Sequence, residues 1–89
     1  MAHYVGVFAH LPTGEWRGLL PDLPGYDVAE RSLDLAILRA TGFLDQLRRL
    51  GTPVPPPRPL AFIELDTDWA SRKHIDWSQS VISMIELRE

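Results

Sequence analysis

The side chains that could bind a metal or exchange protons are few and widely spaced. The only imidazoles are His3, His10 and His74, and the chain has no cysteine. Successive side chains of a strand point to opposite faces, so His3 and His10 lie on opposite faces of the strand that holds both. No His-x-x-x-His pair or paired carboxylate joins them into a metal-binding spacing. The sequence therefore predicts no metal site and no cofactor.

Carboxylates gather between residues 64 and 76, where they could supply calcium ligands. Glu64, Asp66, Asp68 and Asp76 lie there, but the glycine and the terminal glutamate of a calcium loop are missing. No serine stands in a nucleophile elbow with an identifiable base, and no glycine-rich loop could hold a phosphate. We interpret these carboxylates as solvated and expect that the chain is not an enzyme.

Length and charge narrow the class of partner. The chain has 89 residues, enough for a single domain over residues 1–89. Its formal net charge of -3 favours a basic protein partner over nucleic acid or an anionic membrane. The sequence has no signal-peptide pattern and no apolar run long enough to cross a membrane, so we expect a cytoplasmic location.

Alternating apolar residues predict a β-hairpin at the beginning of the sequence. Residues 2–11, AHYVGVFAHL, are apolar on both faces, as in a strand that is covered on more than one side. The turn signal PTG follows, and residues 15–20, EWRGLL, resume an extended pattern. Two strands joined by a short Pro/Gly loop are typical of an antiparallel hairpin.

The segment PDLPG, residues 21–25, forms a stiff corner after the hairpin. Pro21 and Pro24 lack a backbone N–H and favour extended geometry in the preceding residue. Gly25 after Pro24 predicts a type II turn with positive φ at the glycine. Residues 26–30, YDVAE, predict a short third strand with Val28 facing inward.

One amphipathic helix is expected from Ser32 to Leu50. Its apolar stripe consists of Leu33, Ile37, Ala40, Leu44 and Leu47, widened by Ala36, Phe43 and Leu50. Ser32 is a favourable N-cap, and Gly51 supplies the C-terminal stop. Gly42 inside the helix costs about 1 kcal/mol relative to alanine, which predicts that a neighbouring element approaches closely there.

The rest of the chain alternates stiff and polar segments before a final strand. Residues 52–59, TPVPPPRP, predict a polyproline spacer, and residues 60–65 a short helix. Residues 66–79 are polar and are predicted to be irregular or partly helical, and residues 80–89 predict a strand. The order is β-β-β-α-(short α)-β, which indicates an α+β fold of two layers, with the main helix packed on a small sheet.

This order and its motifs resemble the HicB-like antitoxin family. The resemblance rests on the strand YVGVF, the segment EWRGLLPDLPG, a serine-initiated helix about seven residues later, and the exit GTPVPPPRPL. It covers nearly the whole chain, and PDLPG followed by Ser-Leu-x-x-Ala is its most specific part. The chain resembles the small stand-alone members, because no helix-turn-helix or ribbon-helix-helix segment follows its last strand. We therefore expect no direct binding of nucleic acid.

The resemblance implies an antitoxin-type binding protein. It would neutralise a small basic HicA-type toxin, an mRNA-cleaving ribonuclease, by covering the toxin's active face. The hypothesis places the contact on residues that border the hairpin and the corner: Glu15, Trp16, Asp22, Asp27 and Glu30. The turn and cap residues are assigned a structural role: Pro21, Pro24, Gly25, Ser32 and Gly51.

A second hypothesis is a stand-alone protein that assembles with itself, as a dimer or a higher homo-oligomer, without a toxin partner. Exposed strand edges and spare tryptophans would be covered by such an assembly. Tryptophan is enriched at interfaces, so Trp16, Trp69 and Trp77 could be contact residues. They could equally be structural, with Trp16 packing across the hairpin and the other two anchoring residues 66–79 on the sheet.

Overall fold

The computed structural model describes residues 2–87 and confirms the mixed α+β fold expected from the sequence. Four strands form one antiparallel sheet in the order β3-β2-β1-β4. The elements, in chain order, are β1 (Ala2–His10), β2 (Trp16–Leu19), β3 (Asp27–Glu30), α1 (Leu33–Arg49), α2 (Leu60–Glu64), α3 (Thr67–Arg72), the 3-10 turn η1 (Trp77–Gln79) and β4 (Ser80–Leu87). The predicted final strand is thus present up to Leu87, and positions 88 and 89 lie outside the described residues.

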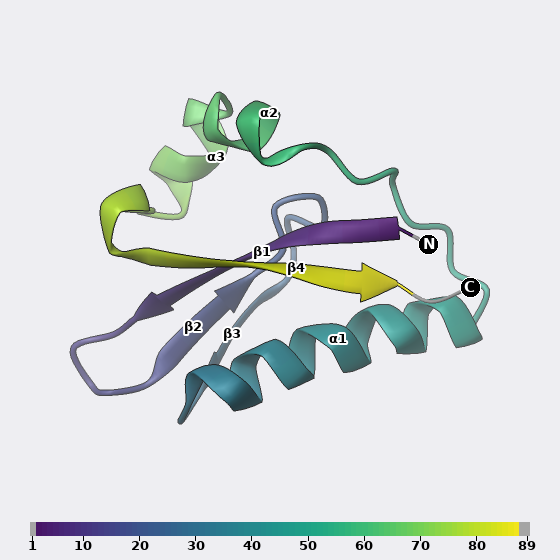
Figure 1. Cartoon of the computed structure of the whole chain (residues 1–89), viewed down its shortest axis with the longest axis horizontal. Coiled ribbons are helices and arrows are strands. Elements are labelled where there is room, and N and C mark those ends of the chain that lie inside the picture. Colours follow the sequence, from purple (N-terminus) through teal and green to yellow (C-terminus); the bar gives the residue numbers. More distant parts are fainter. Residues whose placement is uncertain (1, 88–89) are drawn as a thin grey trace.

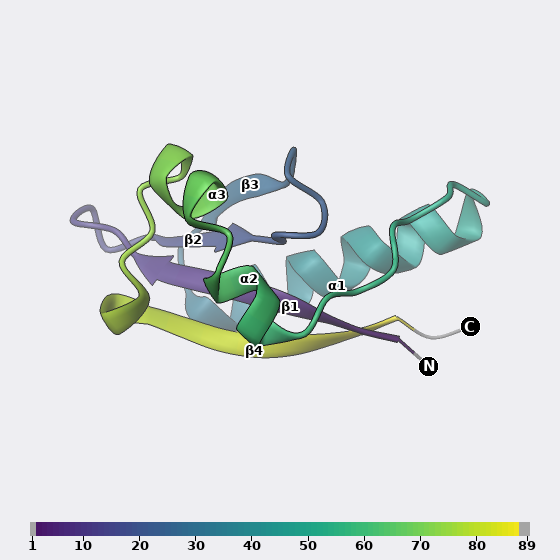
Figure 2. The same cartoon turned by 90° about the horizontal axis from the view of Figure 1, so that it is seen from above.

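Helices cover both faces of the sheet (Figures 1 and 2). The main helix α1 lies along one face, as predicted, and the short helices α2 and α3 add cover on the opposite face. We call these the α1 face and the α2/α3 face. Tyr4 and Phe8 belong to the core on the α1 face, whereas Val5 and Val7 belong to the core on the other. This explains why β1 is apolar on both sides.

β1 occupies the interior of the sheet and pairs with two strands that are far apart in the sequence. It pairs with β2 through the hairpin, with His10 opposite Trp16. On its other side it pairs with β4, in a register that runs from Ala2 opposite Leu87 to Ala9 opposite Ser80. β3 and β4 therefore form the two edges of the sheet as described.

The core of the α1 face is built around the ring of Phe8, which is fully buried. A Cβ atom added to Gly6 would lie 2.8 Å from Phe8 Cε2, and one added to Gly18 would lie 3.2 Å from Phe8 Cε1. The two glycines leave room for the ring, one on its own strand and one directly opposite on β2. The helix contributes three fully buried residues, Ala36, Ala40 and Leu44.

Both ends of α1 are capped by the predicted residues. Ser32 Oγ accepts a hydrogen bond from the N–H of Leu35 at 3.2 Å. At the other end Gly51 adopts φ 69°, and the N–H groups of Gly51 and Thr52 donate to carbonyls of the last turn. These two bonds form a Schellman motif, in which a left-handed glycine lets the chain satisfy the final carbonyls.

Two predictions about this helix are wrong. Leu50 is 70% exposed, because it is the C-cap residue, where the chain has already turned away from the sheet. Gly42 is also exposed, and outside its own helical turn no atom of residues 2–87 lies within 4 Å of the position that its Cβ would take. No element in the described part of the chain approaches this glycine closely, so its lack of a side chain has no packing reason there.

The PDLPG corner consists of two consecutive turns. The N–H groups of Leu23 and Tyr26 each donate to the carbonyl three residues earlier, at 2.8 Å. Pro21 and Pro24 stand at the second position of these turns, where their fixed φ is favourable. The predicted positive φ of Gly25 is wrong, because the second turn closes without a left-handed residue.

The α2/α3 face has a smaller core of its own, which consists of Val5, Val7, Leu19, Ile63 and Trp69. Trp69, on α3, is only 3% exposed, and Trp77, in η1, packs against this core with its ring 6.2 Å from that of Trp69. The two tryptophans thus anchor residues 66–79 on the sheet, and the structural interpretation of both is confirmed.

Candidate functional site

The tip of the β1–β2 hairpin carries a stacked aromatic pair. The rings of His10 and Trp16 lie 4.6 Å apart between centroids, with an angle of 11° between their planes. Trp16 is partly buried and also packs against the core of the α1 face, so it spans the hairpin. Glu15 beside it is exposed, and its carboxylate accepts a hydrogen bond from the hydroxyl of Thr13 at 3.4 Å. The structure therefore brings Glu15 and Trp16 together at the surface.

Asp27, on the edge strand β3, is held by two basic side chains. Arg17 of β2 donates to both carboxylate oxygens of Asp27, at 2.9 and 2.8 Å, and Lys73 Nζ lies 3.5 Å from one of them. The hydrogen bonds from Arg17 lower the pKa of the Asp27 carboxyl below its ordinary value. Arg17 Nη1 also donates to the carbonyl oxygen of Lys73 at 2.5 Å. This cluster ties β2 and β3 to the end of α3.

Glu30, the other acid of β3, lies on the α1 face. Its carboxylate accepts a hydrogen bond from Arg39 Nη1 of α1 at 2.6 Å. Both acids of this edge are therefore paired with basic groups, and the edge is a mixed-charge surface. Of the predicted contact carboxylates, Glu15 alone has no ion pair within residues 2–87.

A groove of about 560 Å³ runs between β3 and α1. Residues of both elements and of the chain before β3 line it, among them Tyr26, Val28, Arg39 and Phe43. The rings of Tyr26 and Phe43 lie 4.7 Å apart at an angle of 40° and form an apolar wall. The Tyr26 hydroxyl is buried, and within residues 2–87 it has no hydrogen-bond partner. Burial raises the pKa of this phenol, so it stays protonated near neutral pH.

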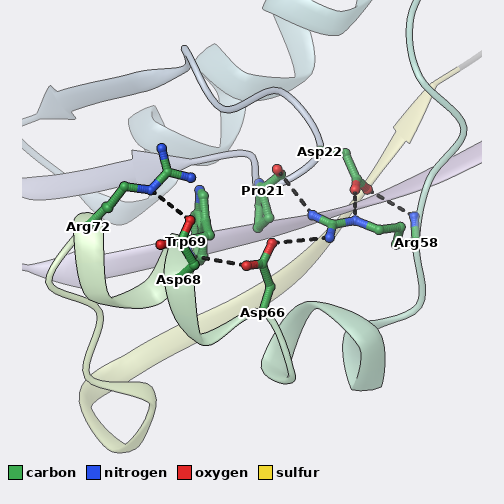
Figure 3. Close-up of polar contacts among 7 residues, drawn as sticks. All are labelled: Pro21, Asp22, Arg58, Asp66, Asp68, Trp69 and Arg72. Atoms are coloured by element: carbon green, nitrogen blue, oxygen red, sulfur yellow. Dashed lines mark hydrogen bonds and ion pairs between the residues drawn. The ribbon is translucent and has the colours of Figure 1, made fainter.

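The PDLPG corner is joined to the spacer and to α3 by one guanidinium (Figure 3). Arg58 Nε donates to Asp22 Oδ1 at 2.5 Å, and the backbone N–H of Arg58 donates to Asp22 Oδ2 at 3.0 Å. The same guanidinium donates to Asp66 Oδ2 and to the carbonyl of Pro21, both at 3.3 Å. Asp66 also caps α3 by accepting from the N–H of Trp69 at 3.1 Å, which lowers the pKa of its carboxyl.

The assignment of Asp22 to a partner surface is wrong. Asp22 is 8% exposed and both of its carboxylate oxygens are used by Arg58, so it holds the fold together instead. The remaining four predicted contact residues, Glu15, Trp16, Asp27 and Glu30, do lie along the hairpin and the β3 edge. Pro21, Pro24, Ser32 and Gly51 occupy the turns and caps expected of them, and Gly25 lies in its turn without the expected conformation.

The site residues that the sequence did not reveal are mostly basic. Arg17, Arg39 and Lys73 neutralise the acids of β3, and Arg58 holds Asp22. Only Arg17 could have been found by pattern, because it lies two positions from Leu19, the residue opposite Asp27 on the neighbouring strand, and therefore on the same face of the sheet. The other three come from elements whose placement depends on the complete fold.

The structure also bears on metal binding and on membranes. Within residues 2–87, no group of three or more acidic or histidine side chains is arranged to hold a metal ion. His3 lies 3.9 Å from Glu86 on the α2/α3 face, whereas His10 stacks on Trp16. None of the helices in the described part of the chain is both long and apolar enough to cross a membrane.

Comparison with models of known protein families found no match, and neither did comparison with curated proteins or with solved structures.

Proposed function

We propose that this chain is a HicB-like antitoxin-type protein, which binds a small basic HicA-type toxin and covers its mRNA-cleaving face. The proposal is supported by the motif PDLPG followed by Ser-Leu-x-x-Ala, and by the net charge of -3. In this proposal the chain is not an enzyme, needs no cofactor, and acts in the cytoplasm, where the messenger RNA is.

The observation that carries the proposal is the β3 edge with the groove beside it. The outer side of β3 has no strand paired with it in residues 2–87, so its backbone can accept an added strand from a partner. The groove of about 560 Å³ next to it could receive a side chain from that strand, against the wall formed by Tyr26 and Phe43. An unpaired edge next to an apolar groove supports protein binding more directly than it supports catalysis.

The carboxylates on this edge favour a basic partner, whose cations can replace the chain's own basic side chains. Glu30 is bound by Arg39, whose side chain is 60% exposed, and a partner's arginine could replace Arg39 on that carboxylate. Glu15 at the hairpin tip is exposed and has no ion pair within residues 2–87, so a basic group can bind it without displacing another cation. Complementary charges of this kind raise association rates and exclude acidic partners.

Co-expression tests the proposal. The candidate toxin for this test is a short basic protein with a central histidine, if an adjacent gene encodes one, and it is expressed alone or together with this chain. We expect the toxin alone to arrest growth and the wild-type chain to restore it. The variant Ala29→Lys, at an exposed position in the middle of β3, should fail to restore growth because it sets a positive charge against a basic partner.

Met84→Lys is the matched control, because Met84 is an exposed position on the opposite edge strand and should keep neutralisation intact. Arrest that persists with the wild-type chain present would overturn the proposed function. If Ala29→Lys relieves the arrest as well as the wild-type chain does, the β3 edge is not the toxin-binding surface. Circular dichroism of both variants establishes that they fold.

A further inference from the structure

The two edges of the sheet are protected to different degrees. Strand β3 has four residues, of which Asp27 and Glu30 are charged. Strand β4 has eight residues, and from Ser80 to Ile85 it carries no charge. Proteins usually protect a free edge by shortness, by charges or by proline, because unpaired N–H and C=O groups invite another strand. The β3 edge has two of these protections, so it discourages pairing except with a partner whose charges complement its own, and the β4 edge has none over most of its length.

Exposed apolar side chains accompany β4 on both faces of the sheet. Met84 is 51% exposed on the α2/α3 face, and Val81 is 37% exposed on the α1 face. Phe62 of α2 is 61% exposed and belongs to the same face as Met84, since α2 lies over β1 and β4 (Figure 2). Leu38 of α1, 66% exposed, lines a groove with Leu87 at the end of β4. Large apolar groups gathered around a free edge are typical of a protein interface.

We propose that β4 pairs with β4 of a second copy of this chain, antiparallel across a two-fold axis. The two four-stranded sheets then join into one continuous sheet. A second copy fits this edge because a two-fold interface brings the same surface against itself, and an uncharged strand can do so without repulsion. A basic partner, by contrast, finds no acidic side chain between Ser80 and Ile85.

The position of the single charged residue of β4 agrees with this arrangement. Glu86 lies near the C-terminal end of the strand, where it is 3.9 Å from His3 of the neighbouring β1. In an antiparallel pair centred between Ser80 and Ile85, the two Glu86 residues lie at opposite ends of the interface. The two Glu86 carboxylates therefore do not face each other at the contact.

This inference is independent of the proposed function, because it uses the other edge of the sheet. The two β3 edges lie at the far ends of the joined sheet and remain free. A dimer of this kind would therefore offer two separate toxin-binding edges. The two properties can be lost separately. Met84→Lys tests self-association, and Ala29→Lys tests toxin neutralisation.

Sedimentation velocity over a range of protein concentrations tests the dimer. We expect the wild-type chain to sediment as a species of twice the 10.1 kDa mass of one chain. Met84→Lys should sediment as one chain at the same concentration, because a lysine on a free edge strand discourages pairing, and two copies would bring like charges together. Ala29→Lys, the equivalent change on β3, should remain a dimer. A wild-type chain that is monomeric throughout, or a dimer lost in Ala29→Lys and kept in Met84→Lys, overturns the proposal.

Single cysteines give a second measurement that does not depend on disrupting the edge. The natural chain has no cysteine, so each variant carries one thiol. The cysteine is introduced in turn at Val81, Ser83 and Met84, and each variant is oxidised. The variant whose cysteine lies next to the two-fold axis should form a disulfide-linked dimer, because only there do the two thiols come close enough. A cysteine at Ala29 should not. Cross-linking at Ala29, or at none of the β4 positions, would contradict pairing through β4.

Discussion

The two faces of the sheet are covered by different means. On the α1 face, one helix of 17 residues lays an apolar stripe across the strands, and its buried contacts are made by apolar side chains. On the α2/α3 face, helices of five and six residues are held by a small apolar core and by polar contacts from distant residues. Arg58 binds Asp22 across 36 positions of sequence, and Arg17 binds the carbonyl of Lys73 across 56.

The difference shows how short helices are kept in place. A helix of five or six residues has too few internal hydrogen bonds to be stable by itself, so its stability comes from tertiary contacts. Removing one contact should therefore loosen the α2/α3 face locally, whereas damage to the α1 face should lower the stability of the whole domain. The following predictions test this contrast, from the largest expected effect to the smallest.

The largest effect is expected from Leu44→Ala, in the middle of the α1 face. Leu44 is fully buried, so its truncation leaves a cavity and should lower the free energy of unfolding by about 2–5 kcal/mol. Denaturant unfolding followed by circular dichroism measures this. Leu50→Ala, at a position that is 70% exposed, should change the free energy by less than about 0.5 kcal/mol. Similar losses in both variants would contradict the assigned core.

A smaller but more localised effect is expected from Asp22→Ala. Its buried carboxylate accepts two hydrogen bonds from Arg58, and their loss should cost about 1.5–3 kcal/mol. Amide hydrogen exchange should accelerate in α2 and α3 more than in α1. Asp68→Ala removes an exposed carboxylate from the first turn of α3 together with its pair with Arg72, and should change stability by less than about 1 kcal/mol. Uniform acceleration across both faces would mean that they open together.

Removal of the N-cap of α1 tests the α1 face, where the effect should be global and not local. Ser32→Ala deletes the acceptor for the N–H of Leu35 and should lower the free energy of unfolding by about 1 kcal/mol. Because α1 packs on the main core, the loss of stability should appear in denaturant unfolding. Amide hydrogen exchange in α2 and α3 should not accelerate more than in the rest of the chain. Ser32→Asp keeps a capping oxygen and should retain most of the stability. Selective exchange of α2 and α3 in Ser32→Ala would contradict the separation of the two faces.

The smallest effect is expected from acid, and it should act first on the α2/α3 face. The hydrogen bonds from Arg17 lower the pKa of Asp27, and the hydrogen bond from the N–H of Trp69 lowers that of Asp66. A depressed carboxyl pKa contributes stability above the ordinary value of 3.8, and this contribution is lost as the pH falls through the folded value. Tryptophan fluorescence and hydrogen exchange between pH 5 and pH 2 measure the change. The double variant with Asp27→Asn and Asp66→Asn should show a weaker pH dependence in α2 and α3, and an unchanged dependence would exclude these two groups as its source.

Much of the fold could be predicted because it is encoded by local patterns. The hairpin, α1 and the caps at Ser32 and Gly51 each follow from residues close together in sequence, and the structure confirms them. The wrong predictions at Gly25, Gly42 and Leu50 concern conformation or packing at single positions, which periodicity does not determine. The conformation of residues 66–79 could not be predicted, because α3 is fixed by Arg58 and by burial of Trp69 against the sheet.

The candidate site was predictable only where it is local. Glu15 and Trp16 lie next to each other in sequence at the hairpin tip, and the structure keeps them together at the surface. Asp22 was misplaced because its partner, Arg58, lies within the polyproline spacer, 36 positions further along the chain, and no spacing rule connects the two. The pairing of Glu30 with Arg39 likewise depends on how α1 crosses the sheet.

The pairing of β1 with β4 has a consequence for the synthesis of the protein. Ala2 stands opposite Leu87, so the edge of β1 that pairs with β4 stays unpaired until all of β4 has been synthesised. At about 5–20 residues per second, this exposes an apolar nascent strand for several seconds. Residues 2–10 are therefore open to pairing with another chain during synthesis, and aggregation can start there.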